Sequence, residues 1–203
     1  MKRTGLVILF LLMVCIVASA GAVSATPSPS SIIVDPPTQN VTSGVQNPWT
    51  VEELSLYSLQ PYDKGDKRVQ SFCGPSNTYH GAGAYKTYKM TRIQGVFIED
   101  GYILVDMDYS TVGKRRVYFK TSAFSNTTHV PQANITGFKA ITTSDVIPRF
   151  GPGIEYDSFT EAALNSNTSI TVLFEEHGYV FAEFDSALGI VRGWIDTASV
   201  QAD

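Results

Sequence analysis

The stretch Arg149-Phe150-Gly151-Pro152-Gly153, with Tyr156 close behind it, decides the fold because its pattern occurs twice in the chain. Gly74-Pro75, followed by Tyr79, carries the same Gly-Pro-aromatic pattern 77 residues earlier. A Gly-Pro step ends a strand, since proline lacks the N–H that a ladder needs and glycine permits a positive φ. The pattern therefore predicts a strand followed by a tight loop at both places.

Two further matches follow in the same order. Residues 99–102 (Glu-Asp-Gly-Tyr) recur as residues 176–179 (Glu-His-Gly-Tyr), again 77 residues apart. Residues 116–121 (Arg-Val-Tyr-Phe-Lys-Thr) match residues 192–197 (Arg-Gly-Trp-Ile-Asp-Thr) at an offset of 76, as a loop one residue shorter would require. Three collinear matches predict an internal duplication of one domain. The two copies are residues 69–124 and 146–200.

Both copies have the periodicity of β-strands. In the second copy Ile170, Val172 and Phe174 alternate with the residues between them. In the first copy Asp100-Gly101 separates two runs rich in β-branched and aromatic residues, which is a strong hairpin signal. Neither copy contains an amphipathic helix of about ten residues. We expect an all-β protein of two small barrels in tandem, with apolar side chains filling each interior.

The order of these motifs resembles the bacterial Src-homology-3-like (SH3b-type) domains of secreted and cell-wall proteins. The second copy carries the resemblance over about 55 residues, through residues 149–153, Tyr156, residues 177–179 and the step Arg-Gly-Trp-Ile at residues 192–195. The first copy is more divergent, because Val117-Tyr118-Phe119 replaces the Gly-Trp-Ile step. The resemblance implies two divergent SH3-like barrels in a secreted binding protein.

The N-terminal residues 1–25 have the pattern of a secretory signal peptide. Lys2 and Arg3 precede an apolar run, and small residues then offer cleavage after Ala20 or Ala25. The alternative is retention of this segment as a membrane anchor. We expect a secreted or extracellular protein that can associate with the cell envelope, without a membrane contact once the signal has been cleaved.

Composition divides the remaining chain into four parts. Residues 26–48 form a Pro/Ser/Thr-rich linker that lacks apolar material to pack, and residues 49–124 hold the first barrel with an N-terminal extension. Residues 125–145 are rich in Thr, Ser and Asn and are expected to be a second linker that permits independent movement. Residues 146–203 form the second barrel.

The charge is divided unevenly between the copies. The whole chain has 15 basic and 19 acidic residues, which gives no support to nucleic-acid binding. Residues 69–124 carry a net charge of +3, and residues 146–200 carry −6. Complementary packing of the two domains would explain the difference. Divided labour, with the basic copy facing an anionic wall polymer, and neutral drift after duplication are the alternatives.

The sequence offers no convincing catalytic or metal-binding set. Cys73 is the single cysteine after signal removal, which excludes an intramolecular disulfide, and it stands in the slot that Phe150 fills in the other copy. His80 could serve as its base, but no third orienting group is evident. Acidic residues such as Asp106, Glu176 and Glu183 are expected to be solvated. We expect no enzyme activity, no cofactor and no metal.

Binding through aromatic side chains is the better-supported hypothesis. Rings bordering a groove could stack on sugars or pack against an extended peptide. The candidate ligand-binding residues are Tyr79, Tyr85, Tyr102, Tyr118, Tyr156, Tyr179 and Trp194. The expected function is a secreted, non-enzymatic module that recognises cell-wall material of the peptidoglycan type. The alternative is an extracellular protein-protein interaction or assembly subunit, whose partner would be a peptide or protein.

Overall fold

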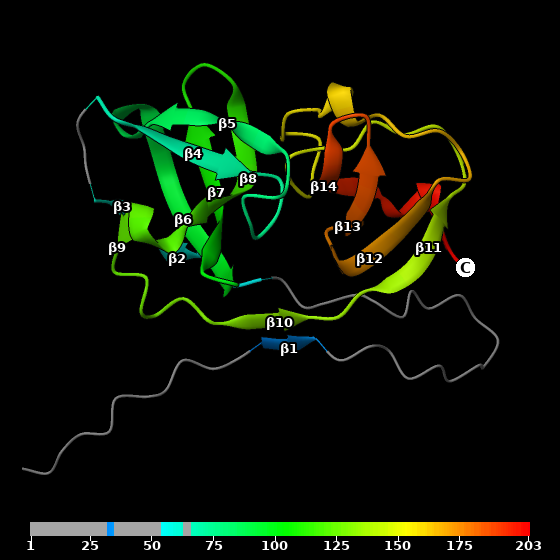
Figure 1. The fold of residues 1–203 in the computed structure, drawn as a ribbon, viewed down its shortest axis with the longest axis horizontal. Coiled ribbons are helices and arrows are strands. Elements are labelled where there is room, and N and C mark those ends of the chain that lie inside the picture. Colours follow the sequence, from blue (N-terminus) through cyan, green and yellow to red (C-terminus); the bar gives the residue numbers. More distant parts are fainter. Residues whose placement is uncertain (1–31, 35–53, 63–65) are drawn as a thin grey trace, which may run out of the picture.

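The computed structural model describes residues 32–34, 54–62 and 66–203 (Figure 1). The expected signal peptide, residues 1–25, and all of the expected linker 26–48 except Ile32–Val34 lie outside the described residues. The protein is all-β, as the strand periodicity predicted, and its only helices in the described part are single 3₁₀ turns. No helix in the described part is both long and apolar enough to cross a membrane.

The first unit, residues 54–62 and 66–125, is built on a three-stranded antiparallel meander. Its sheet has the order β2-β6-β7-β8-β4-β5, and a separate short pair joins β3 to β9. The strands are β2 (Tyr57–Ser58), β3 (Gln60–Pro61), β4 (Arg68–Phe72), β5 (Gly81–Lys86), β6 (Met90–Glu99), β7 (Tyr102–Tyr109), β8 (Gly113–Lys120) and β9 (Phe124–Ser125). Two 3₁₀ turns, η1 (Thr87–Lys89) and η2 (Thr121–Ala123), precede β6 and β9.

The second unit, residues 138–203, has a five-stranded sheet of order β14-β13-β12-β11-β15. Its strands are β11 (Phe138–Thr142), β12 (Ser169–Glu176), β13 (Tyr179–Ser186), β14 (Gly189–Asp196) and β15 (Val200–Ala202). The turn η3 (Thr160–Ala162) lies in the long loop before β12, and η4 (Thr197–Ser199) precedes the last strand. This unit repeats the first: in both, a meander leads through a 3₁₀ turn into a short final strand that pairs with a strand preceding the meander, β3 with β9 and β11 with β15.

The two central hairpins turn where the sequence predicted. Asp100 and Gly101 have φ values of 50° and 79°, and His177 and Gly178 have 53° and 78°. These paired positive angles are what a tight two-residue hairpin requires. The registers also agree, because Tyr102 pairs with Lys120 and Tyr179 with Asp196.

The structure corrects the expected linkers. Residues 138–142 form β11, which pairs with both β12 and β15, so the second sheet begins before residue 146. The strand β10 (Ala133–Ile135) runs between the two units, and Ile98 N donates to Pro131 O at 2.8 Å, which fixes this connection to β6. Within the expected N-terminal linker, β1 (Ile32–Val34) pairs in parallel with β10. Ladder hydrogen bonds, rather than side-chain composition, tie these segments to the fold.

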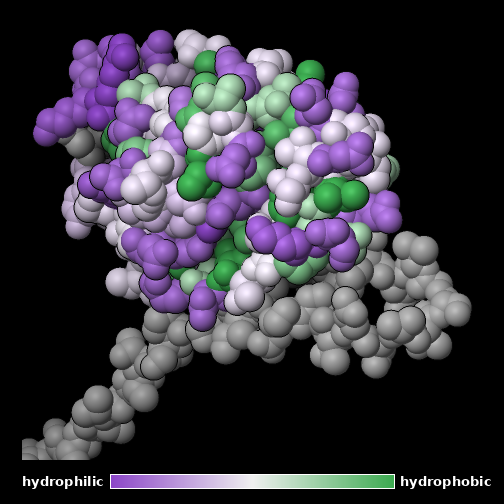
Figure 2. All heavy atoms as spheres, turned by 45° about the vertical axis from the view of Figure 1, so that its right-hand side comes forward, coloured by the Kyte–Doolittle hydropathy of each residue, from purple (hydrophilic) through white to green (hydrophobic). Residues whose placement is uncertain are grey.

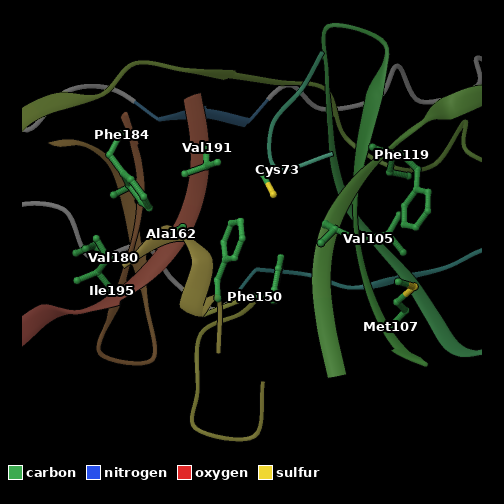
Figure 3. Close-up of a cluster of buried hydrophobic side chains, with 14 of the residues drawn as sticks. Cys73, Val105, Met107, Phe119, Phe150, Ala162, Val180, Phe184, Val191 and Ile195 are labelled. Atoms are coloured by element: carbon green, nitrogen blue, oxygen red, sulfur yellow. The ribbon is translucent and has the colours of Figure 1, made fainter. Parts of the chain in front are cut away.

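The apolar core runs through both units (Figure 3). Val105, Met107 and Phe119 lie on the side of the first unit, and Val180, Phe184, Val191 and Ile195 on that of the second. Cys73 and Phe150 lie between these groups, so the slot that the repeat assigns to both residues is a packing position at the junction. The two units therefore share one body.

Candidate functional site

The aromatic residues that the repeat singled out meet where the two units face each other. The cluster at this junction, called here the interface cluster, draws four buried side chains from each unit: Val96, Phe97, Leu104, Tyr118, Leu173, Phe174, Phe181 and Trp194. Each member of one unit has its repeat equivalent in the other. Phe97 and Phe174 are equivalents of each other and touch directly, with ring centroids 6.0 Å apart. Such self-pairing is the property of an isologous, two-fold interface, here within one chain.

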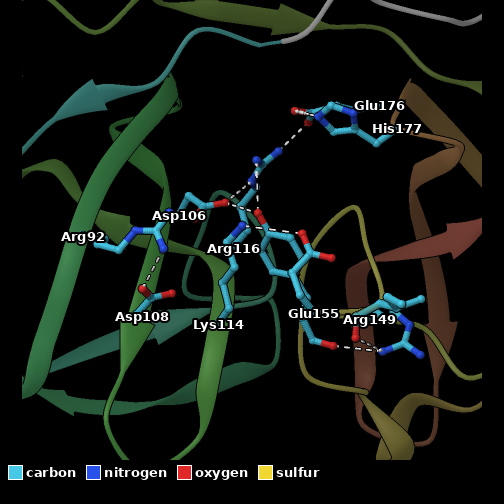
Figure 4. A network of polar contacts seen from close by, with 11 residues as sticks. Arg92, Asp106, Asp108, Lys114, Arg116, Arg149, Glu155, Glu176 and His177 are labelled. Carbon is cyan, nitrogen blue, oxygen red and sulfur yellow. Dashed lines mark hydrogen bonds and ion pairs between the residues drawn. The ribbon is translucent and has the colours of Figure 1, made fainter.

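Arg116 joins the two units through a buried ion-pair network (Figure 4). Its Nε donates to Asp106 Oδ2 of its own unit at 3.0 Å, and its Nη1 donates to Glu176 of the other unit. The Tyr156 hydroxyl donates to the same Asp106 carboxylate. The Arg116, Asp106 and Glu176 side chains are at most 5% exposed. Burial works to lower the pKa of Arg116, but the charges of Glu176 and Asp106 raise it, so the guanidinium stays charged.

Arg192 forms the equivalent network in the opposite direction. Its Nη1 donates to Glu99 Oε2 of the first unit at 2.7 Å, and its Nε donates to Glu183 Oε2 of its own unit at 2.8 Å. The Tyr79 hydroxyl donates to the same Glu183 oxygen at 2.6 Å, as Tyr156 does to Asp106. Burial and this hydrogen bond raise the pKa of Tyr79 to about 12. Each arginine thus binds a carboxylate of its own unit, which also accepts a hydrogen bond from a tyrosine of the other unit, and the hairpin carboxylate of the other unit.

Backbone hydrogen bonds follow the same two-fold pattern. Arg116 N donates to Phe150 O at 2.5 Å, and Arg192 N donates to Cys73 O at 2.6 Å. A second equivalent pair joins His80 N to Ile190 O and Asp157 N to Lys114 O, both at 3.2 Å. The main chains of the two units are therefore bonded directly, which overturns the expectation of independent movement between them.

The unequal charges of the two copies meet across this interface. Arg115 Nε lies 2.9 Å from Asp157 Oδ2, and Lys114 Nζ lies 3.6 Å from Glu155 Oε1. With Arg116–Glu176, three of the four interface ion pairs in the described residues set a base of the first unit against an acid of the second. Complementary packing therefore accounts for part of the charge difference.

The structure places all seven predicted ligand-binding residues in packing positions. Tyr85, Tyr118, Tyr156 and Trp194 are at most 3% exposed, so a ligand could not reach their rings in this arrangement. Tyr79 is half-buried over Gly74, where a Cβ would overlap its ring, and Tyr156 covers Gly151 in the same way. Tyr102 and Tyr179 are half-buried against the interface cluster. Six of them form three repeat pairs that the interface uses, Tyr79 with Tyr156, Tyr102 with Tyr179 and Tyr118 with Trp194, whereas Tyr85 packs within the first unit against Tyr109 and Phe119.

The interface carboxylates are the residues whose environment the sequence analysis missed. Asp106 and Glu176 were expected to be solvated, yet they are 3% exposed, and Glu183 is half-buried. A signal was present, since Glu99 and Glu176 occupy equivalent positions in the repeat, as do the two arginines that bind them. An acid and a base that both recur in the repeat indicate a paired contact rather than solvent exposure.

The thiol of Cys73 is not arranged for chemistry. The residue is 3% exposed, and burial raises its pKa to about 12, although the charge of Arg115 opposes the shift. A reactive cysteine needs the opposite environment, one that stabilises the thiolate. In the described part of the chain, no group of three His, Cys, Asp or Glu residues is placed to hold a metal ion.

Comparison with known proteins leaves the chain without a family. No family model matches it, and no curated protein does. Two solved structures from Trichomonas vaginalis, of NlpC2 and NlpC1, align with 75% and 79% of this chain at 9% and 8% identity, each with a TM-score of 0.31. The chain spans about half the length of these structures, 50% and 51%. A likeness this weak carries no argument about function.

Proposed function

We propose that the protein is a secreted, non-enzymatic binding module that recognises cell-wall material of the peptidoglycan type. The resemblance of its motifs to bacterial SH3-like domains and its signal-peptide pattern support this proposal. The observation that carries it is that the aromatic and charged residues of the repeat form the contacts between the two units. Recognition then belongs to the outer surfaces of one rigid two-unit body.

Two observations favour binding over hydrolysis. The Cys73 thiol is buried with a raised pKa, which opposes nucleophilic attack. The buried carboxylates Asp106 and Glu176 are both paired with Arg116, whereas glycoside hydrolysis requires two carboxyl groups that flank the substrate. These groups stabilise the fold instead.

Sedimentation with purified peptidoglycan sacculi tests the proposal. The chain without residues 1–25 should sediment with the sacculi at low and at moderate salt, and an unrelated protein of similar charge should stay in the supernatant. Retention of the protein in the supernatant under both conditions would show that the proposed function is wrong.

A protein-interaction or assembly role is the alternative, and one feature of the first sheet favours it. The edge strand β5 pairs only with β4 among the described strands, and it begins with the small residues Gly81, Ala82, Gly83 and Ala84. Such an edge can accept an extended peptide as an added strand. Co-purification of one stoichiometric protein partner, in the absence of sacculus binding, would favour this alternative.

A further inference from the structure

A groove on the first unit has not been assigned a role; one of its lining residues, Phe72, packs against the edge of the interface cluster. It is formed where the end of β3, the strand β4 and the turn η2 come together, and its volume is about 420 Å³. This volume is in the range of small-ligand sites. The lining residues are Tyr62, Lys67, Arg68, Val69, Gln70, Phe72, Lys120, Ser122 and Ala123.

The groove combines an apolar floor with a basic rim. Val69, Phe72 and Ala123 are half-buried and supply the floor. Tyr62 is 73% exposed, which leaves the face of a large ring open to solvent beside that floor. Lys67, Arg68 and Lys120 are exposed, and none of the lining residues that the structure describes is acidic.

One carboxylate that neighbours the groove in the sequence is already engaged. Asp66 lies next to Lys67 in the chain, but its Oδ1 is 2.8 Å from Lys86 Nζ. In the part of the chain that the structure describes, no carboxylate lies within ion-pair distance of Arg68 or Lys120. Elsewhere the apolar side chains on the visible surface form small islands among hydrophilic ones, as Figure 2 shows for one face. An exposed ring beside Arg68 and Lys120, neither of which has a described carboxylate within ion-pair distance, is therefore a distinctive surface.

The second unit supplies a natural comparison, because the same place there has the opposite charge. Lys120 is paired with Tyr102, as Asp196 is with Tyr179, so Asp196 is its structural equivalent. At the repeat offset of 77 residues, Asp145 stands where Arg68 stands. Both aspartates are exposed. The shared fold therefore tolerates either charge at these two positions, and the basic rim is a property of the first unit alone.

We propose that this groove binds an anionic polysaccharide segment, one that carries carboxylate or phosphate groups on its sugar rings. The exposed face of Tyr62 and the apolar floor suit the faces of sugar rings. The anionic groups can form ion pairs with Lys67, Arg68 and Lys120. The sugar hydroxyls can form hydrogen bonds with Gln70 and Ser122. This inference rests on the proposed wall-binding function and names the site that would perform it.

An acidic peptide would satisfy the cations but fits the shape less well. Extended peptides are recognised through pockets that take alternate side chains. The structure here has one apolar trough beside a single open ring, which is a platform for a flat ring rather than a row of pockets. The polysaccharide is therefore the occupant that the groove favours.

Titration with defined probes tests the site. The probes are oligogalacturonate, which carries a carboxylate on every ring, its methyl ester, which has the same rings without the charge, and polyglutamate of matched length. Binding is measured by calorimetry with the chain lacking residues 1–25. Oligogalacturonate should bind more tightly than both other probes, and its affinity should fall as salt rises because the contacts are exposed.

The variants use the second unit as their template. Arg68→Asp with Lys120→Asp gives the groove the charges of its equivalent and should weaken oligogalacturonate binding about tenfold or more. Tyr62→Ala should weaken it about fivefold through the lost ring contact. The matched control, Arg92→Asp with Lys139→Asp, removes the same charge outside the groove and should change the affinity less than about twofold. Urea unfolding of each variant verifies that it is folded.

Three results would overturn the inference: an equal loss of affinity in the control, tighter binding of polyglutamate, or no binding of oligogalacturonate at millimolar concentration.

Sedimentation with sacculi distinguishes failure of this inference from failure of the proposed function. If wild type and the Arg68→Asp/Lys120→Asp variant sediment equally with sacculi, the wall function holds and the groove is wrong. If groove-dependent oligogalacturonate binding occurs without sacculus binding, the site holds and the wall function is wrong. Sacculi stripped of phosphodiester-linked polymers by hydrofluoric acid then distinguish phosphate-bearing from carboxylate-bearing polysaccharide.

Discussion

The two units agree on the surfaces that face each other and differ on the surfaces that face outward. At the interface, Arg116 has its equivalent in Arg192, and Phe97 touches its own equivalent, Phe174. On the outside, Lys120 is replaced by Asp196. In a two-fold interface each contact position occurs in both units. A change in one unit therefore breaks a contact with a residue that the other unit still presents. The outer positions carry no such constraint and are free to take on a separate binding role.

The two arginine networks also differ from each other in burial. The Arg116 and Glu176 side chains are both 3% exposed, whereas the Arg192 network includes Glu183, whose side chain is 31% exposed. If the arginine is removed, water can therefore solvate part of the carboxylate charge in the Arg192 network but little of that in the Arg116 network. Equivalent substitutions in the two networks should have unequal costs.

The largest effect is expected from removing Arg116. Arg116→Ala leaves Asp106 and Glu176 buried without a counter-charge and should lower the free energy of unfolding by about 3–5 kcal/mol. Arg192→Ala should cost less, about 2–3 kcal/mol, because Glu183 is closer to solvent. Urea unfolding measures both, with Arg68→Ala as an exposed control that should stay within about 0.5 kcal/mol of wild type. An equal or larger loss for Arg192→Ala would contradict the difference between the networks.

A smaller difference is expected at the two glycines that lie under tyrosine rings. Gly151→Ala should lower the free energy of unfolding by about 1–3 kcal/mol, because Tyr156 is 3% exposed and cannot move away from the new Cβ. Gly74→Ala should cost less, since Tyr79 is half-buried and can tilt toward solvent. Gly81→Ala, whose Cβ would come closest to the flexible end of Gln70, is the control in the same urea experiment. The reverse order of costs would show that Tyr79 is held as tightly as Tyr156.

The smallest effect concerns acid stability. Burial acts to raise the pKa of Glu183, but the hydrogen bonds from Tyr79 and Arg192 and the charge of Arg192 outweigh it, and the pKa is lowered. A carboxyl whose folded pKa lies below its unfolded value stabilises the fold above about pH 4.3, and this contribution is lost as the pH falls through the folded pKa.

Glu183→Gln should therefore be less stable than wild type at neutral pH, and the gap should narrow as the pH falls below about 4. Urea unfolding between neutral pH and pH 3 measures the gap. Asp185→Asn, at an exposed carboxylate on the same strand, is the control. A gap that is constant with pH would show that Glu183 does not contribute through its charge.

The sequence predicted the local structure well and the environment of the side chains poorly. The all-β class and the hairpins at Asp100-Gly101 and His177-Gly178 could be predicted because turn chemistry is local. The strand β11 could not, since its partners β12 and β15 are distant in the chain and its residues were read as a linker. The burial of Tyr156 and Glu176 was likewise hidden, because it arises from contact between two units rather than within one.

The central claim, that the two units form one cooperative body, is tested most directly by hydrogen exchange in a variant of the first unit's core. Phe119 is fully buried and its ring contacts, Tyr85 and Phe124, belong to the first unit, so Phe119→Ala should destabilise that unit by about 3–5 kcal/mol. Exchange followed by mass spectrometry compares the amides of β7 with those of β13 in the second unit. We predict that protection falls by the same amount in both strands. A loss of protection in β7 with β13 unchanged would contradict the claim and restore two independent domains.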